Sequence, residues 1–523
     1  MHRRHFLATT ALPLLGCAPT QDITGGFTGI HHARGHLLRE ARAWPAPNTT
    51  RRTDVLIAGG GVAGLAAARA LRLKGVEDFA LLELEDSAGG NSRGGSVGGI
   101  ACPLGAHYLP VPGDDAPDVQ NLLEELGLRQ RVAGRWVFDE RHLCHSPQER
   151  LFLHGAWQDG LLPLQGVDAG TLAQYRQFAG LVAQLRQQAH WTIPLQNQPL
   201  APIQKALAAI TFAAYLDQHG LQDSYLRWYL DYCCRDDFGA GTATVSAWAG
   251  IHYFASRHGF HAPGTDNAER DGVLTWPEGN AWLTRRLAAP LGDRLHTGQV
   301  VLRIAETRQG VEVDAFDTAS QTVVRWQARK AIVALPVFIA ARVVQNPPDF
   351  LAQAAARTTY APWLVANIHI DKPLHDRPGP APSWDNVLYG APGLGYVDAM
   401  HQSLRPVPAA TVLTYYRALG DVPHGRQQLM EKTWSAWRDA ILAELATAHP
   451  DLAGKTTRVD ITRYGHAMAI PTPAVASQIG LQRLSVERKQ LLKTQRLDFA
   501  HSDWAGYSVF EEAFTRGHHA GGS

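Results

Sequence analysis

The chain has 523 residues, of which 45% are hydrophobic, and its formal net charge is +1. It is long enough to bury a large core and to fold as two or three interlocked domains. Its basic residues are spread along the chain instead of forming a stripe, so we expect no nucleic-acid partner.

The N-terminus carries the pattern of a targeting segment. Arg3 and Arg4 precede a short apolar stretch, residues 8–16, which is followed by Cys17. The paired arginines resemble a twin-arginine export signal, and the Leu-Leu-Gly-Cys ending resembles a lipobox, whose cysteine receives a lipid. The stretch is too short to span a bilayer. We therefore predict an export signal over residues 1–20, a periplasmic location and a membrane tether through Cys17. The alternative is a basic N-terminus with a chance cysteine.

The remaining cysteines and the paired histidines indicate neither a disulfide scaffold nor a metal site. Histidine pairs at residues 31–32 and 518–519 have no further ligands at metal-site spacing, so we expect surface or linker histidines and no metal. The cysteines beyond the signal are few and irregularly spaced, and we expect small buried residues: Cys102, Cys144, Cys233 and Cys234. A redox-active pair at residues 233 and 234 is the alternative, although it lacks C-x-x-C spacing.

After the signal, residues 21–50 contain Gly, Pro and Thr and are predicted to form a linker with one short helix at residues 36–43. A strand–helix–strand unit then follows. Residues 54–58 form a short apolar run typical of a buried parallel strand, residues 62–74 have the small and apolar residues of a helix packed closely on a sheet, and residues 79–83 predict a second strand.

The turn between the first strand and the helix has the spacing G-x-G-x-x-G. Gly59 permits a tight turn, Gly61 lets the backbone approach a pyrophosphate, and Gly64 lets the helix pack on the strand. The helix begins at Val62 and Ala63, where its free N–H groups and positive dipole end favour phosphate. Glu83 ends the second strand, where a carboxylate accepts ribose hydroxyls. This context predicts a dinucleotide site; the alternative is a glycine-rich turn. The next acids, Glu85 and Asp86, are expected to be solvated.

Further along the chain the pattern alternates between helical and strand segments. Residues 119–128 and 201–232 are predicted to be helical, and residues 429–449 to form one long amphipathic helix. Strands are predicted at residues 300–304, 311–316, 323–326, 331–335, 364–371 and 411–416. Two polar-aromatic patches, residues 225–239 and 248–257, line a substrate tunnel or pack in the core; we slightly prefer the core.

Several later motifs resemble the cofactor segments of the flavin-containing amine oxidase superfamily. They are a glycine doublet with the residues after it, a segment that in the family lies along the flavin ring, a Trp-Pro-Glu-Gly-Asn segment at residues 276–280, a strand beside the adenine, and a C-terminal motif. The residues that the resemblance assigns to FAD are Gly89, Gly90, Asn91, Ser92, Arg93, Gly105, Ala106, His107, Val301, Asp503, Tyr507 and Ser508.

The resemblance implies a fold class and domain order. The expected fold is α/β, with a Rossmann-like FAD-binding domain built on a parallel sheet and interleaved with a mixed-sheet and helical substrate domain. The expected FAD-binding parts are residues 51–125, 270–345 and 481–523. The expected substrate parts are residues 126–269 and 346–480.

This sequence departs from the family at three places. Asn91 stands where the family more often has arginine, which moves the phosphate contact to Arg93. The strand position that often holds a lysine near flavin N5 has Val365, Ala366 or Asn367. Residues 463–468 lack the cysteine that bonds flavin covalently in some relatives, so we expect non-covalent FAD unless His466 serves.

The resemblance implies oxidation of an amine by hydride transfer from the carbon next to nitrogen to flavin N5. The substrate is then a small molecule, and oxygen or a quinone or other carrier accepts the electrons. Tyr507 falls on a position that cages the amine in the family, although a packing tyrosine is an equal alternative. Two other functions stay open: an FAD-dependent desaturase or dehydrogenase of an apolar substrate, and a non-catalytic dinucleotide-binding relative.

Overall fold

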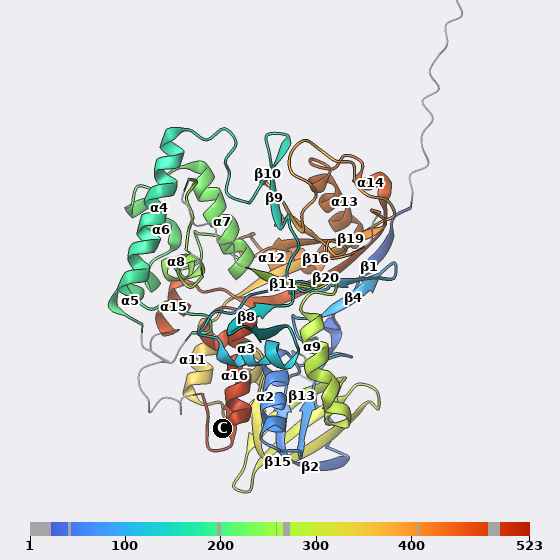
Figure 1. The fold of residues 1–523 in the computed structure, drawn as a ribbon. Helices are drawn as coiled ribbons and strands as arrows, with labels where there is room; N and C mark the ends of the chain where they lie inside the picture. The colour runs from blue at the N-terminus through green and yellow to red at the C-terminus, as the bar shows by residue number, and fades with distance from the viewer. Residues whose placement is uncertain are drawn as a thin grey trace, which may run out of the picture.

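The computed structural model describes residues 22–39, 43–195, 200–257, 259–264, 272–404, 407–479 and 492–523. The predicted export signal, including Cys17, lies outside the described residues. Two large sheets organise the chain, one in the lower part and one in the upper part of Figure 1. None of the helices in the described ranges combines the length and apolar composition that a membrane span requires.

The first sheet has seven strands in the order β12-β3-β2-β15-β14-β13, with β21 also paired to β15. Its neighbours β12, β3, β2 and β15 are parallel, whereas β13 and β14 extend it as antiparallel strands. The bounds are β2 Thr49–Ala58, β3 Phe79–Leu82, β12 Leu295–His296, β13 Gln299–Glu306, β14 Val311–Asp317, β15 Thr322–Val333 and β21 Leu497–Phe499.

Two helices pack against each other beside this sheet, α2 (Val62–Leu73) and α16 (Phe510–Gly522). α2 is buried over nearly its whole length because Ala and Gly dominate its sequence. A Cβ on Gly517 would lie 1.9 Å from the carbonyl oxygen of Ala63, so the glycine lets the helices cross at this distance. The C-terminal helix thereby fixes the start of α2, where the glycine-rich turn ends.

The second sheet is mixed and has eight strands in the order β1-β20-β16-β19-β18-β17-β9-β10. β1 is parallel to β20 and β17 is parallel to β9, and the other neighbours are antiparallel. The bounds are β1 Thr24–Phe27, β9 Glu149–Leu153, β10 Ala156–Asp159, β16 Tyr360–Ile370, β17 Asp385–Leu388, β18 Tyr396–Asp398, β19 Thr411–Ala418 and β20 Thr456–Ala469.

A group of helices covers one side of the second sheet, at the upper left of Figure 1. Their buried aromatic residues form one core with side chains of the sheet. Asp168, Thr211, Asp223 and Ser246 cap four of these helices by accepting a backbone N–H. The bounds are α4 Ala169–Gln188, α5 Pro202–Ala208, α6 Phe212–Gln218, α7 Ser224–Phe238, α8 Ala247–Ala255 and α15 Pro473–Ile479.

The remaining elements connect the two sheets or cover their edges. Three strand pairs are β4 (Gly94–Val97) with β5 (Ile100–Pro103), β6 (Tyr108–Pro110) with β11 (Val273–Thr275), and β7 (Arg129–Val132) with β8 (Arg135–Phe138). The other helices are α1 His32–His36, α3 Pro117–Glu125, α9 Ala281–Ala288, α10 Val337–Val343, α11 Asp349–Arg357, α12 Gly425–Glu431, α13 Trp434–Leu445, α14 Leu452–Lys455, and the 3-10 helices η1 Ala289–Arg294 and η4 Ser502–Ala505.

The structure confirms the expected α/β fold and differs from several predicted elements. The stretch taken as a linker contains β1 and α1, and α1 ends at His36, where the predicted helix was to begin. Residues 323–326 and 331–335 fall mostly within one continuous strand, β15. The long helix predicted at residues 429–449 is wrong, because the chain leaves α12 at Lys432 in an extended conformation and Thr433 caps α13.

Candidate functional site

A cavity of about 480 Å³ is lined by residues from both sheets and from the elements that connect them. Most residues assigned to the cofactor from sequence line it, although they come from distant parts of the chain. Those residues are Gly59, Gly61, Val62, Ala63, Glu83, Gly89, Gly90, Asn91, Ser92, Arg93, Gly105, Ala106, His107, Val301, Asp503 and Ser508.

The turn between β2 and α2 lines the cavity with the backbone of three glycines, residues 59–61. Gly59 has a φ of +102° and its N–H donates to the carbonyl of Leu82 at 2.9 Å. A Cβ on Gly61 would meet only the Cα of Gly90, at 3.8 Å. The backbone N–H groups at the start of α2 have no partners within the helix, so this turn offers donors to an anion.

Glu83 is held in place by backbone amides at the end of β3. Its Oε2 accepts the N–H of Gly60 at 2.8 Å and its Oε1 accepts the N–H of Glu85 at 2.9 Å. Burial raises the pKa of this carboxyl, although the two amides oppose the shift. The side chain lines the cavity beside Val300 and Val301 of β13, so it can accept hydroxyl groups of a ligand there.

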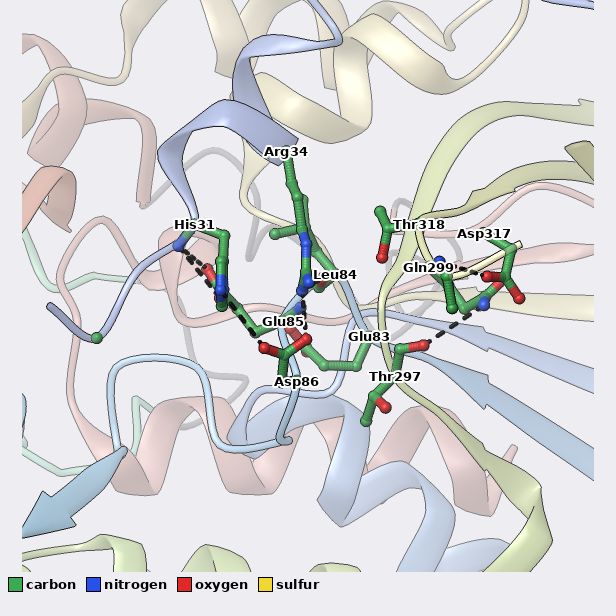
Figure 2. Close-up of polar contacts among 12 residues, drawn as sticks. His31, Arg34, Glu83, Leu84, Glu85, Asp86, Thr297, Gln299, Asp317 and Thr318 are labelled. Atoms are coloured by element: carbon green, nitrogen blue, oxygen red, sulfur yellow. Dashed lines mark hydrogen bonds and ion pairs between the residues drawn. The ribbon is translucent and has the colours of Figure 1, made fainter. Parts of the chain in front are cut away.

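Glu85 is buried and not solvated as expected. It is 7% exposed, and its carboxylate lies 2.6 Å from Nδ1 of His31 and 3.4 Å from Nη1 of Arg93. Asp86 is exposed but pairs with Arg34 at 2.7 Å. Figure 2 shows His31 and Arg34 reaching from the N-terminal segment to these two acids, close to Glu83.

The C-terminal motif brings a second carboxylate to the cavity. Asp503 accepts the N–H of Val337 at 3.0 Å and the hydroxyl of Tyr360 at 2.6 Å. Burial alone would raise the pKa of Asp503, but the nearby His501 and these hydrogen bonds lower it. Ser508 accepts the N–H of Ala469 at 3.2 Å just before α16 begins, so the motif also ties this corner to β20.

Aromatic side chains line another part of the cavity, and we call them the aromatic wall: His107, Trp363 and Tyr416. His107 stacks on Tyr416 with ring centroids 4.4 Å apart, and the hydroxyl of Tyr416 donates to the carbonyl of Gly105 at 2.9 Å. Burial lowers the pKa of His107 to about 3, so its imidazole is neutral. Val365 lines this part of the cavity, Asn367 donates to the carbonyl of Pro103 instead, and no lysine is among the described lining residues.

Two residues assigned from sequence are not among the lining residues. A Cβ on Gly64 would lie 1.9 Å from the carbonyl oxygen of Gly59, which agrees with its expected packing role. Tyr507 is fully buried, and its hydroxyl donates to Oε1 of Glu512 at 3.0 Å. Its ring packs beside Phe238 and Trp248. This placement favours the packing alternative over the amine cage.

Charged residues from α7, from the chain just after α8 and from the start of α16 also line the cavity, and we call them the acidic wall: Asp236, Asp237, Arg257 and Glu511. Arg257 pairs with Asp237 at 3.2 Å. Asp236 and Glu511 have no side-chain ion pair or hydrogen bond to another described residue, and Glu511 is only 5% exposed. Burial raises the pKa of each of these two carboxyls to about 7, and Asp237 contributes to both shifts.

The sequence patterns only partly predicted the acidic wall. The patches at residues 225–239 and 248–257 contain Asp236, Asp237 and Arg257, but most other residues of both patches pack in the core as we preferred. Cys233 and Cys234 are among these buried residues, and burial raises the pKa of both thiols. Nothing in the local pattern distinguishes a lining aspartate from a capping or surface one.

The residues around the glycine turn fit FAD. Arg93 Nε and Asn280 Oδ1 belong to lining residues and are buried without a hydrogen-bond partner among the described residues. Buried polar groups of this kind are normally satisfied, so they indicate a polar ligand. Together with the open glycine turn and Glu83, they offer contacts to the phosphates, ribose and flavin of a dinucleotide. His466 also lines the cavity, and burial, with Arg426 nearby, lowers its pKa to about 4.

Comparison with known proteins gives two kinds of relative. Over 153 residues the chain is 28% identical to an L-amino acid dehydrogenase of Synechocystis, a match that covers 29% of this chain and 30% of that protein. Over 313 residues it is 23% identical to bovine flavin-containing amine oxidase B, covering 56% of this chain and 52% of the relative. The matched regions therefore span about half or less of these curated relatives.

Solved structures share the fold over almost the whole chain. Putrescine oxidase with bound putrescine superposes with a TM-score of 0.67 at 17% identity, covering 90% of this chain and 98% of that one. Cyclohexylamine oxidase from Brevibacterium oxydans gives 0.64 at 18% identity, covering 90% and 98%. A fatty acid isomerase from P. acnes gives 0.60 at 15% identity, covering 89% and 97%. At these identities the likeness shows the fold alone.

The family assignment rests on a match that covers most of the sequence. The model of the family described as flavin containing amine oxidoreductase matches residues 62–520. That range begins at the first residue of α2, directly after Gly61, and contains Gly64, Glu83, the aromatic wall and the C-terminal motif. The chain therefore belongs to the flavin-containing amine oxidoreductase family, whose members are FAD-dependent enzymes.

Proposed function

We propose that this enzyme oxidises a cationic amine, with hydride transfer from the carbon next to nitrogen to FAD. The observation that carries the proposal is the acidic wall, which shares one cavity with the residues that fit FAD. FAD, when bound, supplies the hydride acceptor. The remaining steps depend on what the residues of this chain bind and orient.

The charges of the acidic wall favour a cation. Three carboxylates face one guanidinium, and that guanidinium already pairs with Asp237. Buried ionised carboxylates are costly unless a cation compensates them, so an ammonium group that enters the cavity relieves the repulsion between them. Asp236 and Glu511 are the residues expected to hold it, because they have no other ion-pair partner among the described residues.

The aromatic wall is expected to orient the substrate carbon. Trp363 and Tyr416 lie with ring centroids 6.4 Å apart in an edge-on arrangement and both line the cavity. Aromatic faces attract ammonium groups and pack against the adjoining CH₂ groups. Neutral His107 behind Tyr416 adds no positive charge that would repel the amine.

An amino acid is the second candidate substrate, because Arg257 is a cation in the same cavity and could receive a carboxylate. Its pairing with Asp237 favours a substrate without a carboxylate. A purely apolar substrate would leave the acidic wall uncompensated, which disfavours the desaturase alternative.

The substrate class is tested by steady-state oxidation with an artificial electron acceptor, comparing mono- and diamines, amino acids and an unsaturated fatty acid. We expect turnover of amines, and for Asp236→Asn a rise in KM of about tenfold or more, as for a lost charge-assisted contact. Glu140→Gln, at an exposed carboxylate, serves as the control. Turnover of the fatty acid alone, or unchanged KM in Asp236→Asn, would contradict the proposal.

We further propose that FAD is bound non-covalently. The reason is the absence of a cysteine at residues 463–468, where some relatives attach flavin. Acid precipitation should leave all flavin in the supernatant. Flavin that stays with the protein in the wild type but not in His466→Ala would instead identify His466 as a covalent attachment point.

A further inference from the structure

We propose that residues 28–38, which lie upstream of the part matched by the family, form a clasp over the adenosine end of the dinucleotide site. In this proposal Ile30, Gly35 and Leu38 supply part of the wall around an adenine nucleotide. The clasp must move away before the nucleotide enters or leaves. The inference rests on the proposed FAD site and is independent of which substrate the enzyme oxidises.

The first observation is that residues of the clasp line the same cavity as Glu83. Ile30, Gly35 and Leu38 line it together with Glu83, Val300 and Val301. Leu38 also packs against the apolar side chains of the first sheet and of α10 and α11. Because Glu83 and β13 are the residues that fit ribose and adenine, we place the clasp over the adenosine half; Leu38 packs on that side, and Ile30 also packs against the core that includes Tyr416 and Tyr464.

The second observation is that the clasp is attached to both domains. On one side, the N–H of Thr28 donates to the carbonyl of Ile461 at 2.9 Å and extends the pairing of β1 with β20. On the other side, the carbonyl of Gly29 accepts Nη1 of Arg93 at 2.7 Å. Arg93 lines the cavity, so the clasp and a nucleotide phosphate would share the same guanidinium.

The third observation is the set of polar contacts from His31 and Arg34 shown in Figure 2. The N–H of His31 donates to Oε1 of Glu85 at 3.1 Å, and its Nδ1 lies 2.6 Å from Oε2 of the same carboxylate. Arg34 donates to Oδ1 of Asp86 at 2.7 Å and to the carbonyl of Leu84 at 3.1 Å. Glu85 and Asp86, which receive these contacts, lie two and three residues after Glu83, and the N–H of Glu85 donates to Oε1 of Glu83. Attachment of the clasp is therefore coupled to the position of Glu83.

These contacts can break so that the clasp opens while the rest of the protein stays folded. Each contact joins an exposed side chain to a less exposed one: His31 is 49% exposed and Glu85 9%, and Asp86 is 65% exposed and Arg34 20%. Contacts with one partner in water contribute little each. When a nucleotide is bound, its contacts with the inner face of the clasp help these weak pairs to hold the clasp in place. Nucleotide binding should therefore order the clasp, and loss of the pairs should speed nucleotide release.

The first test is the rate of FAD release from the holoenzyme, followed by the fluorescence of free flavin after dilution. We expect His31→Ala/Arg34→Ala to release FAD about three- to tenfold faster than the wild type, as two partly exposed ion pairs predict. Arg39→Ala, at the exposed arginine directly after the clasp, which has no ion pair in the described part of the chain, should release FAD at the wild-type rate. Equal rates in all three proteins would overturn the proposal.

The second test does not depend on a variant. Hydrogen exchange of the peptide covering residues 28–38 is measured in the wild-type apoprotein with ADP, with FMN and without ligand. We expect ADP to slow exchange in this peptide and FMN to leave it unchanged, with a peptide from α4 as the reference. Equal protection by both ligands, or none by ADP, would overturn the clasp. A protein that takes up FAD but fails these tests leaves the proposed function intact, whereas one that takes up no FAD contradicts both.

Discussion

Individual carboxyl groups determine the net charge of this cavity. Asp236 and Glu511 line the same cavity as Arg257, yet the guanidinium forms its ion pair with Asp237. Their pKa values are raised to about 7, mainly because burial disfavours the charged form. Near neutral pH the empty cavity therefore holds protons that a bound ammonium group would displace.

Glu511→Gln should raise the melting temperature of the apoprotein at about pH 8 by roughly 1–3 °C, with little change at about pH 5. The folded pKa, about 7, lies above the ordinary glutamate value. Between the two values the folded protein binds more protons than the unfolded chain, so stability falls as the pH rises through this window. Glutamine removes that penalty. A melting temperature that is lower at both pH values would show that Glu511 is instead a stabilising charge.

Glu83→Gln should weaken FAD binding about tenfold or more, because the neutral amide makes weaker hydrogen bonds to hydroxyl and N–H groups than the carboxylate does. The measurement is titration of the apoprotein with FAD. Glu140→Gln, the same substitution at an exposed carboxylate away from the cavity and the clasp, is the control. An unchanged dissociation constant in Glu83→Gln would contradict the role assigned to this residue.

Residues whose position depends on local geometry were predictable from the sequence. The turn at Gly59 and the acid at Glu83 belong to one strand–helix–strand unit, so spacing alone places them at the cavity. Asp236 reaches the same cavity only because α7 packs on the second sheet, and no local pattern encodes that contact. Tyr507 occupies the expected motif position but turns its hydroxyl to Glu512, away from the cavity.

At the level of elements, the crossing of α2 and α16 positions both the glycine turn and the C-terminal motif. Gly517 and Gly521 lie against the backbone of Ala63 and Ala67, where a Cβ would come within 1.9 Å and 2.3 Å of carbonyl oxygens. The helices cannot keep this distance with larger residues. The last element of the chain is therefore part of the phosphate-binding end of the site.

Gly517→Ala should lower the stability by about 1–3 kcal/mol, as overpacking in a tight contact does, and should weaken FAD binding by shifting the start of α2. Gly522→Ala is the control, because nothing lies within 4 Å of the Cβ it would add. Thermal unfolding and FAD titration measure the two effects. If the Gly517→Ala protein is as stable as the control, α2 and α16 can move apart without loss of stability, which would contradict the tight crossing.

Element types were easier to predict than element bounds. α2, β3 and β14 lie close to their predicted positions because each has a strong apolar pattern between clear turn residues. β2 ends at Ala58 as predicted but begins at Thr49, inside the stretch taken as linker. The break between α12 and α13 was missed although Thr433 is a typical capping residue, because apolar periodicity continues across it. β1 was predicted as part of a linker because its sequence, Thr-Gly-Gly-Phe, does not indicate a strand. It is a strand because it pairs with β20.

For the whole molecule, the chain enters and leaves the dinucleotide domain repeatedly, and the cavity lies where the two sheets meet. The domain bounds inferred from the recurring cofactor motifs stay a prediction. The contact between the N-terminal segment and Glu85 was not predictable, because residues 22–38 carry no motif that indicates it.

We also propose that the protein is exported and held at a membrane by a lipid on Cys17, on the basis of the sequence pattern at residues 1–20. In cells of a bacterium with the twin-arginine pathway, the wild type should fractionate with membranes. Cys17→Ser should move to the soluble periplasmic fraction with its flavin content unchanged. Cys102→Ser, at a buried cysteine of the folded domain, should stay with the membranes. Equal distribution of the wild type and Cys17→Ser would contradict the tether.

The central claim is that one cavity holds FAD and a cationic amine. It is tested most directly by anaerobic mixing of the purified holoprotein with a panel of amines while the visible absorbance of the flavin is recorded. The account predicts bleaching by at least one amine, at a rate that rises with pH through about 7 as the acidic wall ionises. A holoprotein whose flavin stays oxidised with every amine, or that carries no flavin and takes up none, would contradict it.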